Sequence, residues 1–172
     1  MNNQEKNTYV RNQILRALLT LMQEQPFADI SISALVSTAQ VGRASFYRNY
    51  KSKEDVLQQE SVRLTDAWKA QFEQEHPDGT PQQGNEWLIS LLDFYKEHAA
   101  FYLALYHAGL SDIVLETILG YFDRTPETPN ALAYLNSAVG YMIYGWIQEW
   151  MRRGMQESGT ELARMLAESQ KK

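Results

Sequence analysis

The sequence contains no cysteine, which excludes disulfide bonds and metal sites built from thiolates. It also lacks a long apolar run: the longest, residues 138–147, is interrupted by two glycines and is too short to cross a bilayer. The first residues, MNNQEKNTYVRNQ, are polar and lack the apolar stretch that a secretory signal needs. We therefore expect a soluble protein of the cytoplasm.

Histidine is scarce, and the motifs of the common enzyme classes are missing. The histidines are His76, His98 and His107, and a continuous helix would place the last two on different faces. No H-E-x-x-H, P-loop, G-x-S-x-G or cysteine-based motif occurs, and Glu97 beside His98 is the only suggestive pair. We expect no catalytic residue, no metal site and no cofactor, and predict that the protein is not an enzyme.

Charge is distributed unevenly along the 172 residues, whose formal net charge is -5. Residues 1–63 hold eight Lys/Arg against six Asp/Glu, whereas residues 64–172 hold eight against fifteen. The stretch QVGRASFYRNYKSK, from Gln40 to Lys53, has four positive charges, three aromatics and no carboxylate. Such a local basic patch is typical of a nucleic-acid contact, because the local field matters more than the overall isoelectric point.

Apolar residues recur at helical spacing along the whole chain, and no segment alternates for long, so we predict an all-α fold. A short helix begins after Ser31 as N-cap, residues 39–42 form a tight turn, and a second short helix begins after Gly42. Capping signals at Ser52 and Ser158 begin two later helices, and another helix is expected over 112–122. The two short helices and their turn have the arrangement of a helix-turn-helix DNA-binding domain. We predict this domain in residues 1–52 and a helical regulatory domain in residues 53–172, with a connecting helix over 53–72 and a loop over 73–84.

The second short helix is predicted to lie in the major groove of DNA. Arg43 would form bidentate hydrogen bonds to guanine, the small Ala44 and Ser45 would approach base edges, and the tyrosine and cations that follow would meet phosphates. Phe46 and Tyr50, four residues apart, would pack this helix onto the first one. The alternative for the basic residues is a merely solvated face. The predicted DNA-binding residues are Ser31, Ser33, Arg43, Ala44, Ser45, Tyr47, Arg48, Lys51 and Lys53.

Residues 27–57, with Phe46-Tyr47, Tyr50 and the Lys-x-Lys-Glu-Asp start of the next helix, resemble the N-terminal domain of TetR-type transcriptional regulators. The resemblance implies a homodimer on a palindromic operator, with Tyr47 and Lys53 at phosphates. This chain departs from the family pattern at two positions of the turn: Gln40 stands where Gly is usual, and Gly42 where Ser or Thr is usual. We expect Gln40 to adopt a strained backbone angle at a cost of about 1 kcal/mol, and Gly42 to make no side-chain contact.

The C-terminal half, through residues 94–102 and 146–155, is similar to one TetR C-terminal subgroup, which includes regulators of dihydroxyacetone utilisation. The resemblance implies that a signal bound among these helices changes operator affinity. Most aromatics of this half must be core, but a buried phenol needs a hydrogen-bond partner that a ligand can supply. The predicted ligand-binding residues are Phe94, His98, Tyr102, Tyr106 and Tyr141.

The last two predicted helices offer a surface for a second copy of the chain. Small residues would let helices approach closely, while bulky apolar residues would fill a two-fold interface. The alternative is that these residues form an intrachain core. The predicted dimer residues are Ala133, Ser137, Gly140, Trp146, Trp150, Met151, Leu162 and Leu166.

We therefore predict a sequence-specific, DNA-binding transcriptional regulator. Repression in response to a small-molecule effector of unknown identity is the expectation that the resemblance implies. The alternative is a regulator controlled by a protein partner, or an adaptor whose acidic C-terminal half binds other proteins.

Overall fold

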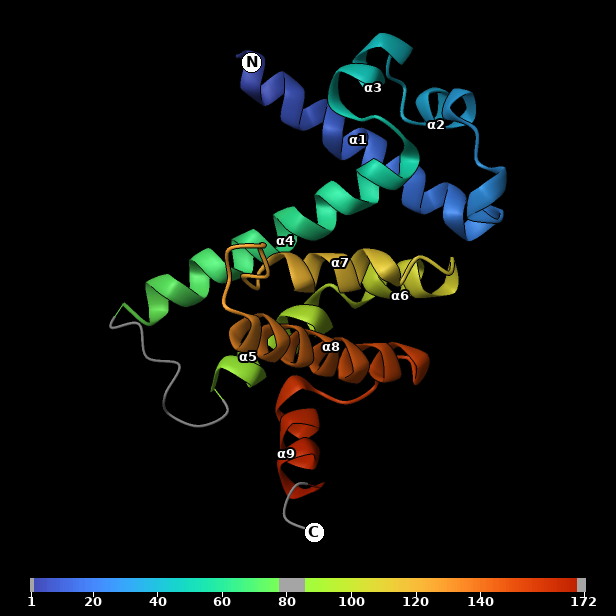
Figure 1. Cartoon of the computed structure of the whole chain (residues 1–172). Coiled ribbons are helices and arrows are strands. Elements are labelled where there is room, and N and C mark those ends of the chain that lie inside the picture. Colours follow the sequence, from blue (N-terminus) through green and yellow to red (C-terminus); the bar gives the residue numbers. More distant parts are fainter. Residues whose placement is uncertain (1, 78–85, 170–172) are drawn as a thin grey trace. The chain divides into compact units, whose positions relative to one another are not determined.

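The computed structural model describes residues 2–77 and 86–169, and every regular element in these residues is a helix (Figure 1). The all-α prediction is therefore confirmed. In chain order the elements are α1 (Asn3–Glu24), the short 3-10 helix η1 (Phe27–Asp29), α2 (Ile32–Thr38), α3 (Arg43–Asn49), α4 (Lys53–Glu75), α5 (Glu86–Glu97), α6 (Ala99–His107), α7 (Asp112–Gly120), α8 (Asn130–Arg152) and α9 (Gly159–Ser169).

The chain forms two compact units, Met1–Ser61 and Val62–Lys172, and the division between them falls within α4. In the first unit α2 and α3 pack on each other and on α1. Residues three or four apart on α1 form the apolar stripe that helical spacing predicts. The buried apolar residues of this unit are Ile14, Ala17, Leu18, Leu21, Ile30, Leu35, Ala39, Phe46, Tyr50, Val56 and Leu57.

The turn between α2 and α3 is a Schellman motif with Gln40 in the left-handed region. The N–H of Val41 donates to the carbonyl of Val36 at 3.0 Å, and that of Gln40 to the carbonyl of Ser37 at 3.1 Å. Gln40 has a φ of 54°. The strained angle expected at Gln40 is thus confirmed, because this position of the motif favours glycine.

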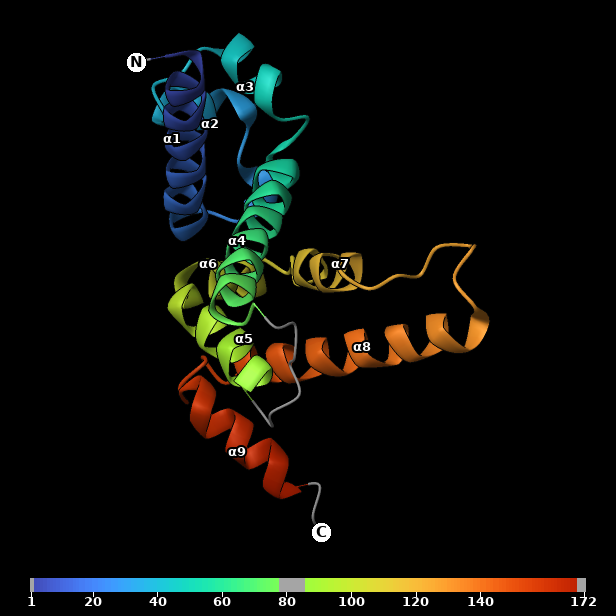
Figure 2. The ribbon, with the colours of Figure 1, turned by 90° about the vertical axis from the view of Figure 1, so that its left-hand side faces the viewer.

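In the second unit α5 packs on α9 and α6, and both α6 and α7 pack on α8. Gly159, the first residue of α9, lies so close to α5 that an added Cβ would meet Asp93 Oδ1 at 2.3 Å. The carboxylate of Asp93 accepts from the N–H of Gly159 at 3.0 Å and so binds the start of α9. Figure 2 shows the N-terminal part of α8 extending past the other helices of this unit.

The predicted caps are present, and two predicted helix ends are corrected. Ser52 accepts from the N–H of Asp55 at 3.2 Å, and Ser158 and Glu161 form a reciprocal capping box at the start of α9. The connecting helix continues to Glu75 rather than ending at residue 72, and residues 78–84 of the predicted loop lie outside the described residues. The helix expected over 112–122 ends at Gly120.

No helix within residues 2–77 and 86–169 is both long enough and apolar enough to cross a membrane.

The strain at Gln40 predicts an unusual mutational response. We expect Gln40→Gly to raise the free energy of unfolding by up to about 1 kcal/mol, since glycine adopts the positive φ without a steric penalty. Urea denaturation followed by circular dichroism measures this change. The control is Ser37→Gly in α2, which should lower stability by about 0.5–1 kcal/mol. If both variants are destabilised equally, the left-handed angle carries no strain.

Candidate functional site

α3 buries one side chain and presents its polar residues to solvent. Phe46 is fully buried, whereas Arg43, Ala44, Tyr47 and Arg48 are exposed. Positions 43 and 47, and likewise 44 and 48, are four apart and therefore share one helical face. The guanidinium of Arg43 lies 5.9 Å from the ring centroid of Tyr47. The predicted packing of Phe46 is thus confirmed, and α3 offers two cations and a phenol on its outer surface.

The other predicted DNA-binding residues differ in what they contact. Ser31 is exposed, and its hydroxyl accepts from the N–H of Ala34 at 3.1 Å as the N-cap of α2. Ser33 is also exposed, and Ser45 is half-buried. Lys51 is exposed, while its backbone N–H donates to Asp55 at 2.8 Å. None of these contacts removes the side chain of Lys51 from solvent, so it stays a predicted phosphate contact.

A hydrogen-bond network holds the C-terminal end of α3 against α1 and α4. Arg11 donates to the hydroxyl of Tyr50 at 3.3 Å and to the amide oxygen of Gln59 at 3.1 Å. The amide of Gln59 in turn donates to Asp55 at 3.1 Å and to the carbonyl of Asn49 at 3.3 Å. Burial raises the pKa of Tyr50 above its ordinary value, so this phenol stays neutral. The network fixes the orientation of α3.

Lys53, which the sequence predicts as a phosphate contact, is hydrogen-bonded to backbone carbonyls in this structure. Its ammonium donates to the carbonyls of Phe27, Ala28 and Ile30, the last two at 3.1 and 2.9 Å. It also lies 4.5 Å from the ring centroid of Phe27. These bonds occupy the three N–H donors of the ammonium. Lys53 therefore ties the start of α4 to η1, and a phosphate could reach this ammonium only by displacing carbonyls.

The second unit contains a cavity of about 350 Å³ bounded by α4, α5, α7 and α8. Its walls are mainly aromatic and aliphatic, with a few polar residues. The lining residues are Thr65, Trp68, Lys69, Phe72, Glu73, His76, Trp87, Leu91, Tyr95, Ile118, Tyr121, Phe122 and Ile143. A cavity of this size and character is within the range of small-molecule sites, about 300–1,000 Å³.

The predicted ligand-binding residues do not line this cavity. Phe94 and His98 border an adjoining, more polar depression between α4 and α5, whose lining shares Trp68, Phe72 and His76 with the cavity. Tyr102 is fully buried beside Tyr95, with ring centroids 4.5 Å apart, and Tyr106 is half-buried. Tyr141 is 54% exposed on α8. The structure therefore brings three of the five together: the ring centroid of Phe94 lies 5.1 Å from that of His98 and 6.1 Å from that of Tyr102. Tyr141 is not part of this group. The aromatics that do line the cavity, among them Trp68, Phe72 and Tyr95, have the same helical spacing as core residues, so no sequence pattern distinguishes them.

One cavity residue is hydrogen-bonded to α4. The hydroxyl of Tyr121, just after α7, donates to Asp66 Oδ1 at 2.6 Å and lies 3.4 Å from the carbonyl oxygen of Val62. Burial and the bond to Asp66 raise the pKa of Tyr121 well above its ordinary value, so the phenol remains a donor. Lys69 lies 5.9 Å from the centroid of the same ring. Movement of Tyr121 would therefore change its hydrogen bond to Asp66 on α4.

The dimer surface predicted on α8 and α9 is corrected in part. Trp150 and Met151 are 2% and 1% exposed in a single chain, so they belong to its core and have no surface to share with a second copy. Gly140 faces α7, where an added Cβ would meet Leu119 Cδ2 at 2.6 Å. For Gly140, the close helix approach is therefore an intrachain contact between α7 and α8. Ala133, Ser137, Trp146, Leu162 and Leu166 are half-buried.

The opposite face of α8 is exposed and apolar. We call this set the α8 outer face, and its positions recur every three or four residues, as one helical face requires. Its residues are Tyr134, Leu135, Ala138, Tyr141, Met142 and Gly145, and all of them are exposed. An added Cβ on Gly145 would meet nothing within 4 Å. A contiguous apolar face of this kind indicates an interaction surface.

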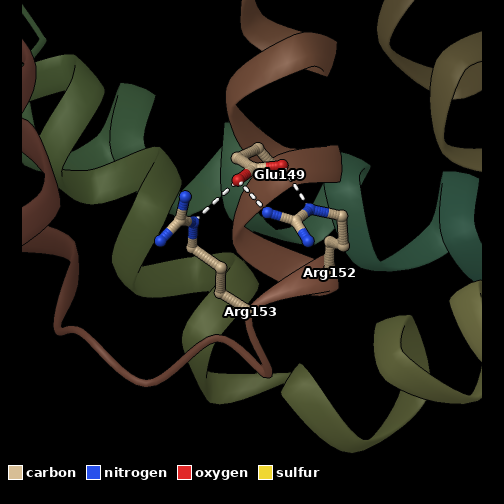
Figure 3. Close-up of polar contacts among 3 residues, drawn as sticks. All are labelled: Glu149, Arg152 and Arg153. Carbon is tan, nitrogen blue, oxygen red and sulfur yellow. Dashed lines mark hydrogen bonds and ion pairs between the residues drawn. The ribbon is translucent and has the colours of Figure 1, made fainter.

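A charged cluster lies at the C-terminal end of α8 (Figure 3). Arg152 donates to both carboxylate oxygens of Glu149 at 2.6 and 2.7 Å, and Arg153 donates to the same group at 2.7 Å. The bonds from Arg152 and then Arg153 lower the pKa of Glu149 to about 2. Glu149 therefore stays ionised at neutral pH, and the cluster marks a polar end to the apolar outer face.

Two family models match the chain. The model described as "Bacterial regulatory proteins, tetR family" matches residues 14–59, and the one described as "Transcriptional regulator C-terminal region" matches residues 82–172. The first match spans the helix-turn-helix, and the second spans α5–α9. A comparison with curated proteins gave no match.

Solved structures share the fold at low sequence identity. The crystal structure of Lin0861 from Listeria innocua has a TM-score of 0.79 at 16% identity, covering 99% of this chain and 94% of that one. A structure from Syntrophomonas wolfei, described as a TetR-family transcriptional regulator, has a TM-score of 0.68 at 14% identity, covering 96% and 94%. At such identities the likeness establishes the fold alone.

The contacts of Lys53 predict a stability role for this residue. We expect Lys53→Met to lower the free energy of unfolding by about 1.5–3 kcal/mol, because charge-assisted hydrogen bonds to three carbonyls are lost. Urea denaturation measures the change. The control is Lys51→Met, which removes an exposed ammonium of the same kind and should change stability by less than about 0.5 kcal/mol. Equal stabilities for the two variants would contradict the assignment.

Proposed function

Because this chain belongs to the TetR family of bacterial transcriptional regulators, we propose that it binds a palindromic operator as a homodimer and represses transcription until a signal reaches its C-terminal helices. The observation that carries the DNA contact is the orientation of α3. Phe46 is buried, so Arg43, Ala44, Tyr47 and Arg48 are presented outward together. Arginine with a small neighbour suits base edges, and the flanking phenol and cations suit phosphates.

The homodimer is proposed to form through the α8 outer face. Ala138 and Gly145 are small enough to let two copies of α8 approach closely, while Tyr134, Leu135, Tyr141 and Met142 supply apolar area. A two-fold contact brings the same face of each copy together, so a single apolar surface forms both sides of the interface. Arg152 and Glu149 would lie at the polar rim of this contact.

The signal is proposed to be a small molecule bound in the 350 Å³ cavity. The concave, largely apolar wall supports this choice, because such pockets are typical of small-molecule sites. Tyr121 lines the cavity and donates to Asp66 on α4, the helix that also contributes Lys53 to the first unit. A ligand that displaces Tyr121 would thereby change the equilibrium between conformations with different operator affinity.

Substitutions on α3 test the DNA contact. Arg43→Ala should weaken operator binding by about 1–3 kcal/mol and relax sequence preference, since a base-specific contact is lost. Arg48→Ala should weaken binding to all duplexes and reduce the slope of log K against log salt by about 1. Footprinting on DNA flanking the gene identifies the operator, and fluorescence anisotropy at several salt concentrations measures both effects. Unchanged affinity and slope in both variants would refute the proposed contacts.

A substitution on the α8 outer face tests the proposed dimer. Leu135→Glu should raise the dimer dissociation constant at least roughly hundredfold, because each copy would bury an unpaired carboxylate. Sedimentation velocity measures the association. Tyr9→Glu, an exposed apolar residue on α1, should leave the dimer intact and serves as the matched control. A Leu135→Glu protein that sediments like the unaltered dimer would exclude this face.

A further inference from the structure

The aromatic wall of the 350 Å³ cavity restricts the shape of its ligand, and this inference rests on the regulator function proposed above. Six aromatic side chains line the cavity: Trp68, Phe72, Trp87, Tyr95, Tyr121 and Phe122. Trp68 lies at the centre of a ring cluster, with centroids 5.9 Å from Phe72 and 6.0 Å from Trp87. Aromatic rings prefer offset or edge-to-face contact with other rings. A flat, conjugated molecule therefore fits this wall better than a branched or sugar-like one.

The charged groups of the cavity lie at its rim and are already paired. Lys69 and Glu73 form an ion pair at 3.8 Å, and their side chains are 54% and 66% exposed. His76 contacts the carbonyl of Phe72 through Nδ1 at 2.9 Å and faces Glu86 through Nε2 at 3.8 Å. The other described lining residues, which form the inner wall, are uncharged and cannot pair with a charged ligand. A charged ligand would lose its hydration without compensation, which favours a neutral one.

Tyr95 supplies the polar contact of the inner wall. The residue is 1% exposed and lines the cavity, and no described residue forms a hydrogen bond with its hydroxyl. Burial raises the pKa of Tyr95 well above its ordinary value, so the hydroxyl stays protonated and can both donate and accept. A buried phenol of this kind needs a partner. An oxygen or nitrogen atom of a ligand would meet that need.

We propose that the cavity binds a neutral, flat, largely apolar aromatic compound with one hydrogen-bonding oxygen or nitrogen, which meets the hydroxyl of Tyr95. Tyr95 is then the specificity-determining residue. The aromatic wall supplies affinity, and the lack of a counter-charge among the described residues of the inner wall disfavours ionised compounds.

Three bicyclic probes of the same ring system test the ligand class: naphthalene, 2-naphthol and naphthalene-2-sulfonate. Isothermal titration calorimetry on the full-length protein measures their binding. We expect 2-naphthol to bind about two- to tenfold more tightly than naphthalene, in line with one added hydrogen bond. The sulfonate should bind at least about tenfold more weakly than 2-naphthol, because its charge cannot be paired. Binding of all three with equal affinity, or of none, would overturn the proposal.

The variant Tyr95→Phe tests the hydrogen bond proposed between the Tyr95 hydroxyl and the ligand. It should abolish the preference for 2-naphthol while changing the affinity for naphthalene by less than about twofold, because only the hydroxyl is removed. Tyr9→Phe makes the same chemical change outside the cavity and should keep the preference. A preference that survives Tyr95→Phe would overturn the role of Tyr95.

Operator binding without ligand, measured on the same samples, separates this proposal from the proposed function. Loss of the probe preference with intact operator binding would count against the ligand class alone. Absence of operator binding in the unaltered protein would count against the regulator function itself.

Discussion

Burial of Phe46 is the constraint on which the DNA-facing surface depends. α3 has seven residues, and a helix of that length is not stable alone. It forms because Phe46 and Tyr50 fix it to the first unit, with Arg11 bound to the Tyr50 hydroxyl. Once Phe46 points inward, helical periodicity places Arg43 and Tyr47 outward. The hydrophobic contact of Phe46 therefore orients α3 so that the charges of Arg43 and Arg48 lie at the surface.

Residues of the same type have different roles here because their neighbours differ. Arg43 and Lys53 belong to one carboxylate-free stretch, yet only Arg43 is left exposed. Lys53 begins α4, where three carbonyls at η1, more than twenty residues earlier in the chain, lie within reach of its ammonium. Carbonyls at the end of a short helix have free lone pairs, and a flexible lysine stem can bring its N–H donors to them. Charge patterning alone does not separate these two cases, since it records the cation and not the distance to its acceptors.

α8 is a second element for which the sequence pattern does not separate two structural roles. It is apolar on nearly all sides, so periodicity indicated two buried faces without assigning either to the core or to a partner. The face with Gly140 packs against α7, where an added Cβ would force Leu119 to shift. The face with Leu135 and Tyr141 stays exposed. Similarly, Tyr95 and Tyr102 are both buried tyrosines at helical spacing, but only Tyr95 borders the cavity.

The sequence by itself determined the helical class, the caps at Ser31, Ser52 and Ser158, the strained Gln40 and the inward side of α3. All of these depend on residues close together in the chain, where local sterics and hydrogen bonding decide. The tertiary structure alone decided which face of α8 is covered, where the cavity lies and which acceptors Lys53 meets. Those outcomes depend on contacts between residues far apart in sequence, such as Lys53 with Phe27 or Tyr121 with Asp66, and no local pattern encodes such distances.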